Sequence, residues 1–356
     1  MKKNPRVLFD GVGTAVTAVI GQFIRSSSDW GKHTPRVRLV DNALWTQKHA
    51  ACGLIPRRDV NEAKAVAQAS RLRDAGYEVD AFVDEVRHRP RGDYLHAITV
   101  AGTDSHETKY FSVQSSLQAG SPAIAMGLGN RQATVEIFTP GGAGYCCVHG
   151  NDPSWTERVP CRVAAPVSTT AIALRDHGSR EVVDAAGKLV ARLITDYYAT
   201  GQIVGNRGTL LSGASVQWFQ YAAGSCEGPH DPPLQIQEPN VTKCDGGSDR
   251  KLIELLERLG EDARYADREL AWNWMCERCQ RMQRRLHTVF PPARCETCRS
   301  RMLAAPQRVS GLSATEIQEL GGAELSLRDL GLGNETLLRC SVQGELTWLI
   351  LTNNAQ

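Results

Sequence analysis

Short apolar runs alternate with helical patterns through the first part of the chain. The run at 7–9 leads into a turn at 11–13 and then into an apolar helix at 14–24. A second run at 37–40 ends on an acid, Asp41. Because strands that alternate with helices of about 10 to 15 residues form βαβ units, this pattern predicts an α/β fold with a mostly parallel, Rossmann-like sheet.

The following elements continue the same alternation. Apolar residues at helical spacing indicate helices, and continuous short apolar runs indicate strands. In chain order we expect a helix at 60–75, strands at 78–83 and 96–101, a helix from His106, strands at 122–126 and 133–138, a long helix at 181–199 and a strand at 215–221.

A change of composition divides the chain. Residues 224–248 are rich in Gly, Pro, Ser and Asp, which indicates a linker. With 356 residues the chain can form two domains and a small appendage. We therefore predict a first domain over 1–223, a linker over 224–249, a helix with a cysteine-rich module over 250–305, and a small α+β domain over 306–356 that ends in strands at 336–342 and 345–352.

Charge and hydropathy narrow the class of protein. The net charge of +2 gives no reason to expect nucleic acid or a membrane surface as a partner. No apolar run approaches the ~20 residues that span a bilayer, and the N-terminus enters a strand too soon for a signal peptide. We therefore expect a cytoplasmic protein, whose eleven cysteines serve as metal ligands, reactive thiols or packing residues and not as a disulfide framework.

Four cysteines form two pairs with the same internal spacing. Two residues separate Cys276 from Cys279, and two separate Cys295 from Cys298. This spacing turns both sulfurs of a pair toward one point, and two such pairs complete a tetrahedral zinc site. Four thiolates leave no open coordination position, so the predicted zinc is structural. Arginines around the pairs could contact nucleic acid, but we interpret them as cations that balance the negative zinc–thiolate charge.

The turn after the first strand has the residues of a nucleotide site. Gly11 and Gly13 precede a helix N-terminus, where backbone N–H groups can approach phosphates. Asp41 ends the second strand and can bond ribose hydroxyls. Val16 stands where a third glycine is usual, and a glycine turn before a helix can be a turn and nothing more. These residues alone leave the nucleotide site and the structural turn as alternatives.

A second acid, Asp104, follows the strand at 96–101. It lies at the carboxyl end of a predicted parallel strand, where open α/β sheets bind ligands. A carboxylate there can hold a divalent cation. Asp and Ser are also favoured as the N-cap of a helix, and one begins near His106. The residues alone leave the metal ligand and the helix cap as alternatives.

Several of these motifs, in this order, resemble those of one family. Over about residues 6–221 the chain resembles the ubiquitin-activating-enzyme superfamily, which includes the ThiF and MoeB adenylyltransferases. The 325–332 stretch resembles the end of the ubiquitin-fold domain of activating enzymes. The matching motifs of the first part are Gly11-Val-Gly13, Leu39-Val40-Asp41, the 57–64 stretch with Lys64, Thr103-Asp104-Ser105, the glycine–cysteine turn at 141–147, and the 159–164 stretch, which is similar to the family's thioester motif.

The resemblance implies how ATP would be held. Gly11 and Gly13 would approach the phosphates, and Asp41 would hold the ribose. Lys64 would pair with phosphate charge, and Asp104 would coordinate the Mg²⁺ that bridges the phosphates. Such a site promotes transfer mainly by positioning the reactants and neutralising charge.

The resemblance also implies a nucleophile. Cys161, in a catalytic-cysteine segment near 151–180, would attack the acyl-adenylate and hold the modifier as a thioester. Arg162 stands where threonine is usual, and a cation beside a thiol favours the thiolate. The family's Asn and Arg after the ribose acid are not evident in this chain, and Arg57 or Arg58 would take the place of the arginine.

Together these features imply an enzyme that activates a ubiquitin-like protein. It would use ATP and Mg²⁺ to adenylate a C-terminal glycine, form a thioester and pass the modifier to a conjugating enzyme. The compact size resembles the bacterial activating enzymes of Bil-type antiviral conjugation operons, and the family implies a homodimer. From the charge and hydropathy of the chain we expect no membrane or nucleic-acid partner. The alternatives are a sulfur-carrier adenylyltransferase without a thioester, a degenerate nucleotide-binding scaffold and an NAD-dependent oxidoreductase.

Overall fold

The computed structural model describes residues 6–26, 30, 34–51, 53–129, 131–149, 180–212, 215–221, 241–245, 247–289, 292–304, 308–309, 311–333 and 337–352. The chain divides into two compact units. The first unit comprises Met1–Arg89 and Asp93–Leu234, and the second comprises Pro90–Gly92 and Gln235–Gln356. In the part of the chain so described, no helix has both the length and the apolar character that crossing a bilayer requires.

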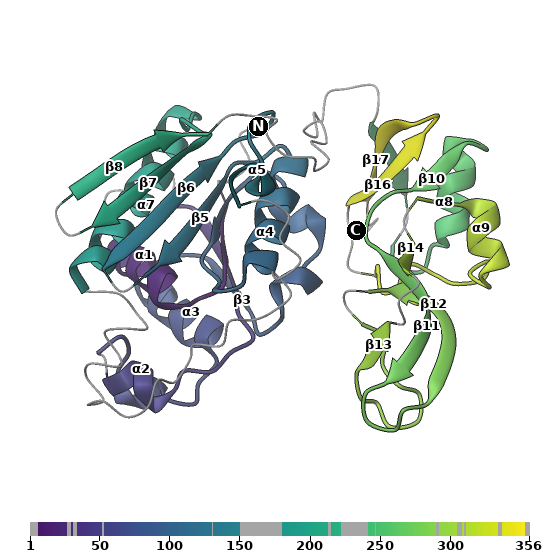
Figure 1. Cartoon of the computed structure of the whole chain (residues 1–356), viewed down its shortest axis with the longest axis horizontal. Helices are drawn as coiled ribbons and strands as arrows, with labels where there is room; N and C mark the ends of the chain where they lie inside the picture. Colours follow the sequence, from purple (N-terminus) through teal and green to yellow (C-terminus); the bar gives the residue numbers. More distant parts are fainter. Residues whose placement is uncertain are drawn as a thin grey trace. The chain divides into compact units, whose positions relative to one another are not determined.

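An eight-stranded sheet forms the centre of the first unit (Figure 1). The strand order is β3-β2-β1-β4-β5-β6-β7-β8, and the first five strands of this order are parallel. From β5 onward each strand is antiparallel to its neighbour. The strands are β1 (Arg6–Asp10), β2 (Arg36–Val40), β3 (Val79–Phe82), β4 (Ala97–Ala101), β5 (Ala123–Leu128), β6 (Gln132–Phe138), β7 (Arg207–Ser212) and β8 (Ser215–Gln220).

Helices cover both faces of this sheet (Figure 1). On one face, α1 (Thr14–Arg25), α3 (Lys64–Asp74) and α7 (Arg180–Thr200) share a core with alternate strand residues. On the other face, α4 (His106–Gln118) and the short α5 (Tyr145–His149) pack on the remaining strand residues. Smaller elements are α2 (Gln47–Ala51) and 3₁₀ turns at Arg57–Asp59, Val86–His88 and Arg91–Tyr94. The predicted α/β fold with a mostly parallel sheet is therefore confirmed.

The second unit contains two smaller sheets. One has the order β15-β10-β16-β17-β9; in the other, β11 pairs with β12, β13 and β14. Helices α8 (Leu252–Leu259) and α9 (Ala314–Glu319) contribute to a leucine-rich core. The strands are β9 (Val241–Asp245), β10 (Ala263–Tyr265), β11 (Leu270–Cys276), β12 (Met282–Thr288), β13 (Met302–Ala304), β14 (Arg308–Val309), β15 (Leu312–Ser313), β16 (Leu337–Val342) and β17 (Glu345–Thr352).

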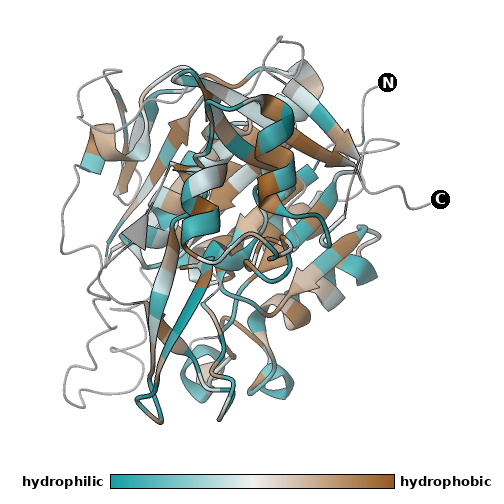
Figure 2. Ribbon diagram, turned by 90° about the vertical axis from the view of Figure 1, so that its right-hand side faces the viewer, coloured by the Kyte–Doolittle hydropathy of each residue, from teal (hydrophilic) through white to brown (hydrophobic). Residues whose placement is uncertain are grey.

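The pairing in this unit joins two ranges that the sequence predicts as separate. Strand β10, within 250–305, pairs with β15 and β16, both within 306–356. Strand β9 pairs in parallel with β17, the last strand of the chain. The start of the 250–305 range and the end of the chain therefore share one sheet and one core, whereas Cys276 and Cys295 are buried in a separate cluster around Trp274. Figure 2 shows that the helices of the protein carry both hydrophobic and hydrophilic stretches, as helices with one buried face do.

Candidate functional site

Three chemistry-bearing segments follow three adjacent parallel strands of the first unit. Strand β1 lies between β2 and β4, and Asp10, the last residue of β1, is in register with Val40 and Ala101, which end the two neighbours. The glycine turn, Asp41 and the segment from Gly102 therefore leave the sheet side by side. Neighbouring strands are about 4.8 Å apart, so one ligand can reach all three segments.

The glycine turn makes a close approach to the next segment. Gly11 has a φ of +81°, and a Cβ on it would lie 2.5 Å from Cγ2 of Thr103. Any other residue at position 11 would therefore be strained and would collide. Gly13 is the N-cap of α1, which has no side-chain cap bond and no acidic residue in its first turn. A helix N-terminus without acids is suited to an anion.

Val16 occupies the position where the family has a third glycine, and the structure shows how it fits. Gly102, after β4, packs against it, and a Cβ on Gly102 would lie 2.4 Å from Cγ2 of Val16. The close approach of helix and strand is thus kept, with the glycine on the strand side of the contact.

Two backbone N–H groups orient the side chain of Asp41. Its Oδ2 accepts a hydrogen bond from the N–H of Val12 at 2.6 Å, and its Oδ1 accepts one from Ala43 at 2.8 Å. Each oxygen keeps a second lone pair for a hydroxyl group. The carboxylate is therefore fixed against the glycine turn and can still accept bonds from a ligand.

Lys64 is tied to the same region through the segment after Asp41. It is the first residue of α3, and its backbone N–H donates to the carbonyl of Ala43 at 3.0 Å. Its Nζ lies 5.2 Å from the ring centroid of the buried Trp45. A cation at that distance is attracted by the ring, which holds the amine of Lys64 beside the segment that carries Asp41.

The structure shows which residue caps the start of α4. Ser105 is the N-cap, and its hydroxyl oxygen accepts a bond from the N–H of Thr108 at 3.2 Å. Asp104, one residue earlier, is exposed and has no capping bond. Its carboxylate is therefore free of the cap role and accessible from the carboxyl end of the sheet.

Two other predicted residues, Arg57 and Arg58, make no contact with this group. Arg57 and Arg58 lie in an exposed 3₁₀ turn, where Arg58 is near Asp59 at 3.6 Å. Within the described residues, neither arginine contacts Asp41 or Asp104. Cys161 lies outside the described residues, as does most of the segment predicted near 151–180.

A buried acid at the same place was missed from the sequence. Asp10, the last residue of β1, is fully buried, and the hydroxyl of Tyr94 donates to its Oδ2 at 3.0 Å. Burial raises its pKa from 3.8 to about 7, although the Tyr94 bond favours the charged form. An acid that ends an apolar strand and precedes a glycine was the available signal.

We expect Asp10→Asn to make stability less dependent on pH. Because the folded pKa is raised, the folded state binds more protons than the unfolded state between pH 3.8 and about 7. The free energy of unfolding of the unmodified protein should therefore fall over this range relative to the variant, by roughly 4 kcal/mol at most. Thermal denaturation across a pH series measures this difference, and parallel profiles for the two proteins would contradict it.

A second cluster that the sequence did not reveal lies between α4, α5 and β6. Glu136 is buried; it accepts a bond from Tyr221 at 3.1 Å and contacts Nε2 of His149 at 2.9 Å. Lys109 is buried within electrostatic range of Glu136 and Asp104, and burial lowers its pKa while both carboxylates oppose that effect. The cluster thus places the buried amine of Lys109 within electrostatic range of Asp104, on the antiparallel side of the sheet.

The four paired cysteines of the second unit form one cluster. Their sulfur atoms all lie within 4.8 Å of one another, with 3.4 Å between Cys276 and Cys298 and 3.7 Å between Cys279 and Cys295. Zinc–sulfur bonds of about 2.3 Å at tetrahedral angles imply about 3.8 Å between sulfurs. The residue after each pair, Gln280 or Arg299, has a positive φ and closes a tight turn on the cysteines. This geometry fits a structural zinc ion.

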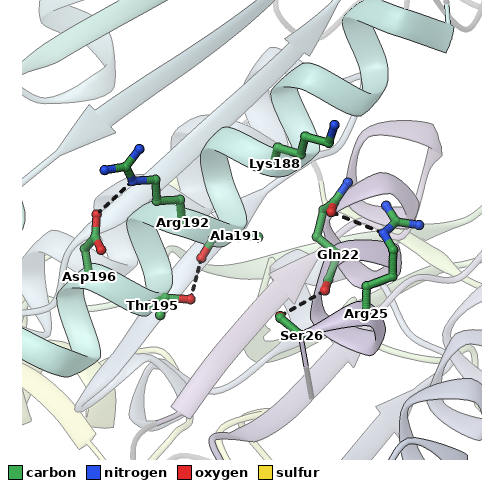
Figure 3. Close-up of a pocket in the computed structure, with 8 residues that line it drawn as sticks. All are labelled: Gln22, Arg25, Ser26, Lys188, Ala191, Arg192, Thr195 and Asp196. Carbon is green, nitrogen blue, oxygen red and sulfur yellow. Dashed lines mark hydrogen bonds and ion pairs between the residues drawn. The ribbon is translucent and has the colours of Figure 1, made fainter. Parts of the chain in front are cut away.

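An open pocket of about 300 Å³ lies at a different place, between α1 and α7 (Figure 3). It is lined near the end of α1 by Gln22, Arg25 and Ser26. Gln22 is nine residues beyond Gly13, or about 13 Å along the helix. The pocket is therefore separate from the glycine turn, and we assign it no role.

No protein-family model and no curated protein matches the chain. Among solved structures, E. coli MccB is similar, with a TM-score of 0.46 and 15% identity, covering 65% of this chain and 67% of that chain. An E. coli MccB structure with ATP has a TM-score of 0.44 and 14% identity over 62% and 64% of the chains. PaaA has a TM-score of 0.45 and 13% identity over 61% and 72%. Likenesses this low carry no argument about what the chain binds, which must come from its own residues.

Proposed function

We propose that this chain is an ATP-dependent adenylating enzyme that activates the C-terminal carboxylate of a small ubiquitin-like protein. One observation carries the proposal: the glycine turn, Asp41 and Asp104 follow three adjacent parallel strands that end in register. The order of these features along the chain is also the order of the motifs in the ubiquitin-activating-enzyme superfamily. A glycine turn that binds no ligand has no need of Asp41, which is held against its backbone. It also has no need of Asp104, an exposed acid that does not cap a helix.

In this proposal each residue has a distinct task. The N-terminus of α1 binds phosphate, Asp41 accepts bonds from the ribose, and Lys64 offsets phosphate charge. Asp104 would hold Mg²⁺, which would add positive charge beside the phosphates. The modifier's carboxylate oxygen bonds to the α-phosphorus, the bond from that phosphorus to the bridging oxygen breaks, and pyrophosphate leaves with the electron pair. Catalysis then comes from positioning and charge neutralisation.

The free edge of the sheet supports a protein substrate. Strand β8 is the last strand of the eight, and all its residues are exposed. Val216, Trp218 and Phe219 are 52%, 46% and 40% exposed. The guanidinium of Arg207 lies 4.4 Å from the Trp218 ring centroid. Edge strands with apolar side chains are suited to pairing with a strand of another protein.

The finer part of the proposal is thioester formation at Cys161. The thiolate would attack the acyl-adenylate carbonyl and release AMP, and the modifier would then pass to the thiol of a conjugating enzyme. Incubated with ATP, Mg²⁺ and a small protein that ends in glycine, the chain should form a covalent adduct that a thiol reagent cleaves. The adduct should be absent from Cys161→Ala. If pyrophosphate exchange persists without any adduct in either protein, the sulfur-carrier alternative is favoured.

One observation favours a second candidate, a nucleotide-binding scaffold without turnover. The two arginines predicted to replace the family arginine are exposed and make no contact with Asp41 or Asp104. A scaffold would bind Mg–ATP but exchange no pyrophosphate with any carboxylate substrate. Equilibrium binding of ATP measured beside the exchange assay separates the two candidates.

A further inference from the structure

Three exposed apolar side chains form a row across the small sheet of the second unit. Met275 of β11 lies opposite Met282 of β12 and opposite Leu303 of β13. Residues that face each other across antiparallel strands point to the same side of the sheet. Met282, Met275 and Leu303 are 60%, 41% and 40% exposed. We call these three residues the Met–Leu row.

The Met–Leu row differs from ordinary exposed apolar residues because its members are adjacent. Single apolar side chains on a surface need no explanation, but a contiguous group usually marks an interaction site. The neighbours of Met275 along β11, Trp274 and Cys276, are buried on the opposite face. The sheet therefore already has a packed side, and the row is on the side that this unit leaves uncovered.

Positive charge is concentrated in the stretch of chain that carries most of the row. Seven arginines and two glutamates lie between 277 and 301, so this stretch has an excess of five positive charges, of which a zinc tetrathiolate would offset two. Arg284 of β12 is two positions from Met282, and Arg301, just before β13, is two positions from Leu303; both arginines are exposed. The exposed arginines, none of which forms an ion pair within the described chain, are Arg278, Arg281, Arg284, Arg294, Arg299 and Arg301.

We propose that the Met–Leu row and its arginines are a docking surface for an acidic protein segment with an apolar anchor residue. The arginines complement aspartate and glutamate, while the row offers a site for one or two apolar side chains. Methionine adapts its shape to different apolar partners. A zinc ion bound by Cys276, the residue after Met275, would keep the small sheet under the row rigid. This surface is independent of the adenylation site proposed above.

A nucleic acid is the competing occupant, and the row argues against it. Proteins that bind single strands place aromatic rings under the bases, whereas the row offers thioethers and methyl groups. The two tryptophans of β11 do not serve instead, because Trp274 is buried and Trp272 is half-buried against the core. The chemistry of the row therefore fits a protein better than a base.

The test is an unbiased selection. A random peptide library displayed on phage is panned against the full chain, and the selected peptides are synthesised with a fluorescent label. We expect enrichment of Asp and Glu around one apolar residue, with binding that weakens as salt rises. A selected peptide should bind about tenfold more weakly to M282S/L303S and to R284Q/R301Q. The matched control V83S/V204S, at exposed apolar positions of the first unit, should bind as the unmodified protein does.

The other outcomes overturn the proposal. The first is a selection whose peptides lack the acidic–apolar pattern. The second is a set of peptides that bind all four proteins equally. The third is a labelled single-stranded oligonucleotide that binds M282S/L303S but no longer binds R284Q/R301Q. Unchanged zinc content and melting temperature confirm that each variant is folded. Because the four substituted side chains are exposed, we expect both measurements to stay the same.

Discussion

Asp104→Asn should lower ATP–pyrophosphate exchange at least about 100-fold. The substitution removes the negative charge at the carboxyl end of β4 but leaves the Ser105 cap of α4 intact, because the cap bond to Thr108 comes from Ser105. A loss of exchange would therefore show that Asp104 acts on Mg²⁺ and phosphate, because α4 keeps its cap. The measurement is incorporation of labelled pyrophosphate into ATP in the presence of the modifier.

The control is Asp74→Asn at the exposed last residue of α3, which removes the same charge far along the helix from Lys64. It should leave exchange unchanged. Equal exchange in the unmodified protein and in Asp104→Asn would remove Asp104 from the mechanism. The melting temperature of Asp104→Asn should equal that of the unmodified protein without nucleotide, and should no longer rise with Mg–ATP.

Loss of one cysteine of the cluster should unfold the small sheet of the second unit. Structural zinc contributes on the order of 10 kcal/mol in small domains, more than a sheet with few buried residues can replace. In Cys298→Ser we expect zinc binding to be lost and amide protons of β11, β12 and β13 to exchange rapidly. Protection in β1 and β4 of the first unit should be unchanged. Metal analysis and hydrogen exchange measure these effects.

Cys147→Ser is the matched control, since Cys147 is half-buried in the first unit and is not part of the four-cysteine cluster. It should retain zinc and normal protection in the second unit. Retention of protection by Cys298→Ser together with loss of the metal would show that packing around Trp274 suffices without zinc.

The parallel half of the main sheet was predictable because its strands are buried on both faces. Such strands appear in the sequence as continuous apolar runs, as at 7–9 and 96–101, and they are separated by helices. The strand β7 was missed, because Arg207–Ser212 belongs to the antiparallel part and mixes polar with apolar residues. In the second unit β12 was missed for the same reason, since arginines occupy its exposed positions.

The candidate site was predictable where backbone geometry requires a residue type. Gly11 needs a positive φ, and Asp41 and Asp104 follow strand ends, so local patterns point to them. The cluster around Glu136 was not predictable, because its members come from α4, α5 and β6 and meet only through the fold. The identity of the α4 cap also required the structure, because Asp104 and Ser105 are both good cap residues.

The contact between Gly102 and Val16 has a consequence for how relatives of this chain can be recognised. A glycine in the helix usually leaves room for the close approach of helix and strand. Here Gly102, after β4, leaves that room, so position 16 can carry a valine only while position 102 has no side chain. The two positions form a coupled pair although they are 86 positions apart in the chain. A search that scores the first turn as one contiguous signature would reject such proteins, whereas one that scores both positions jointly would retain them.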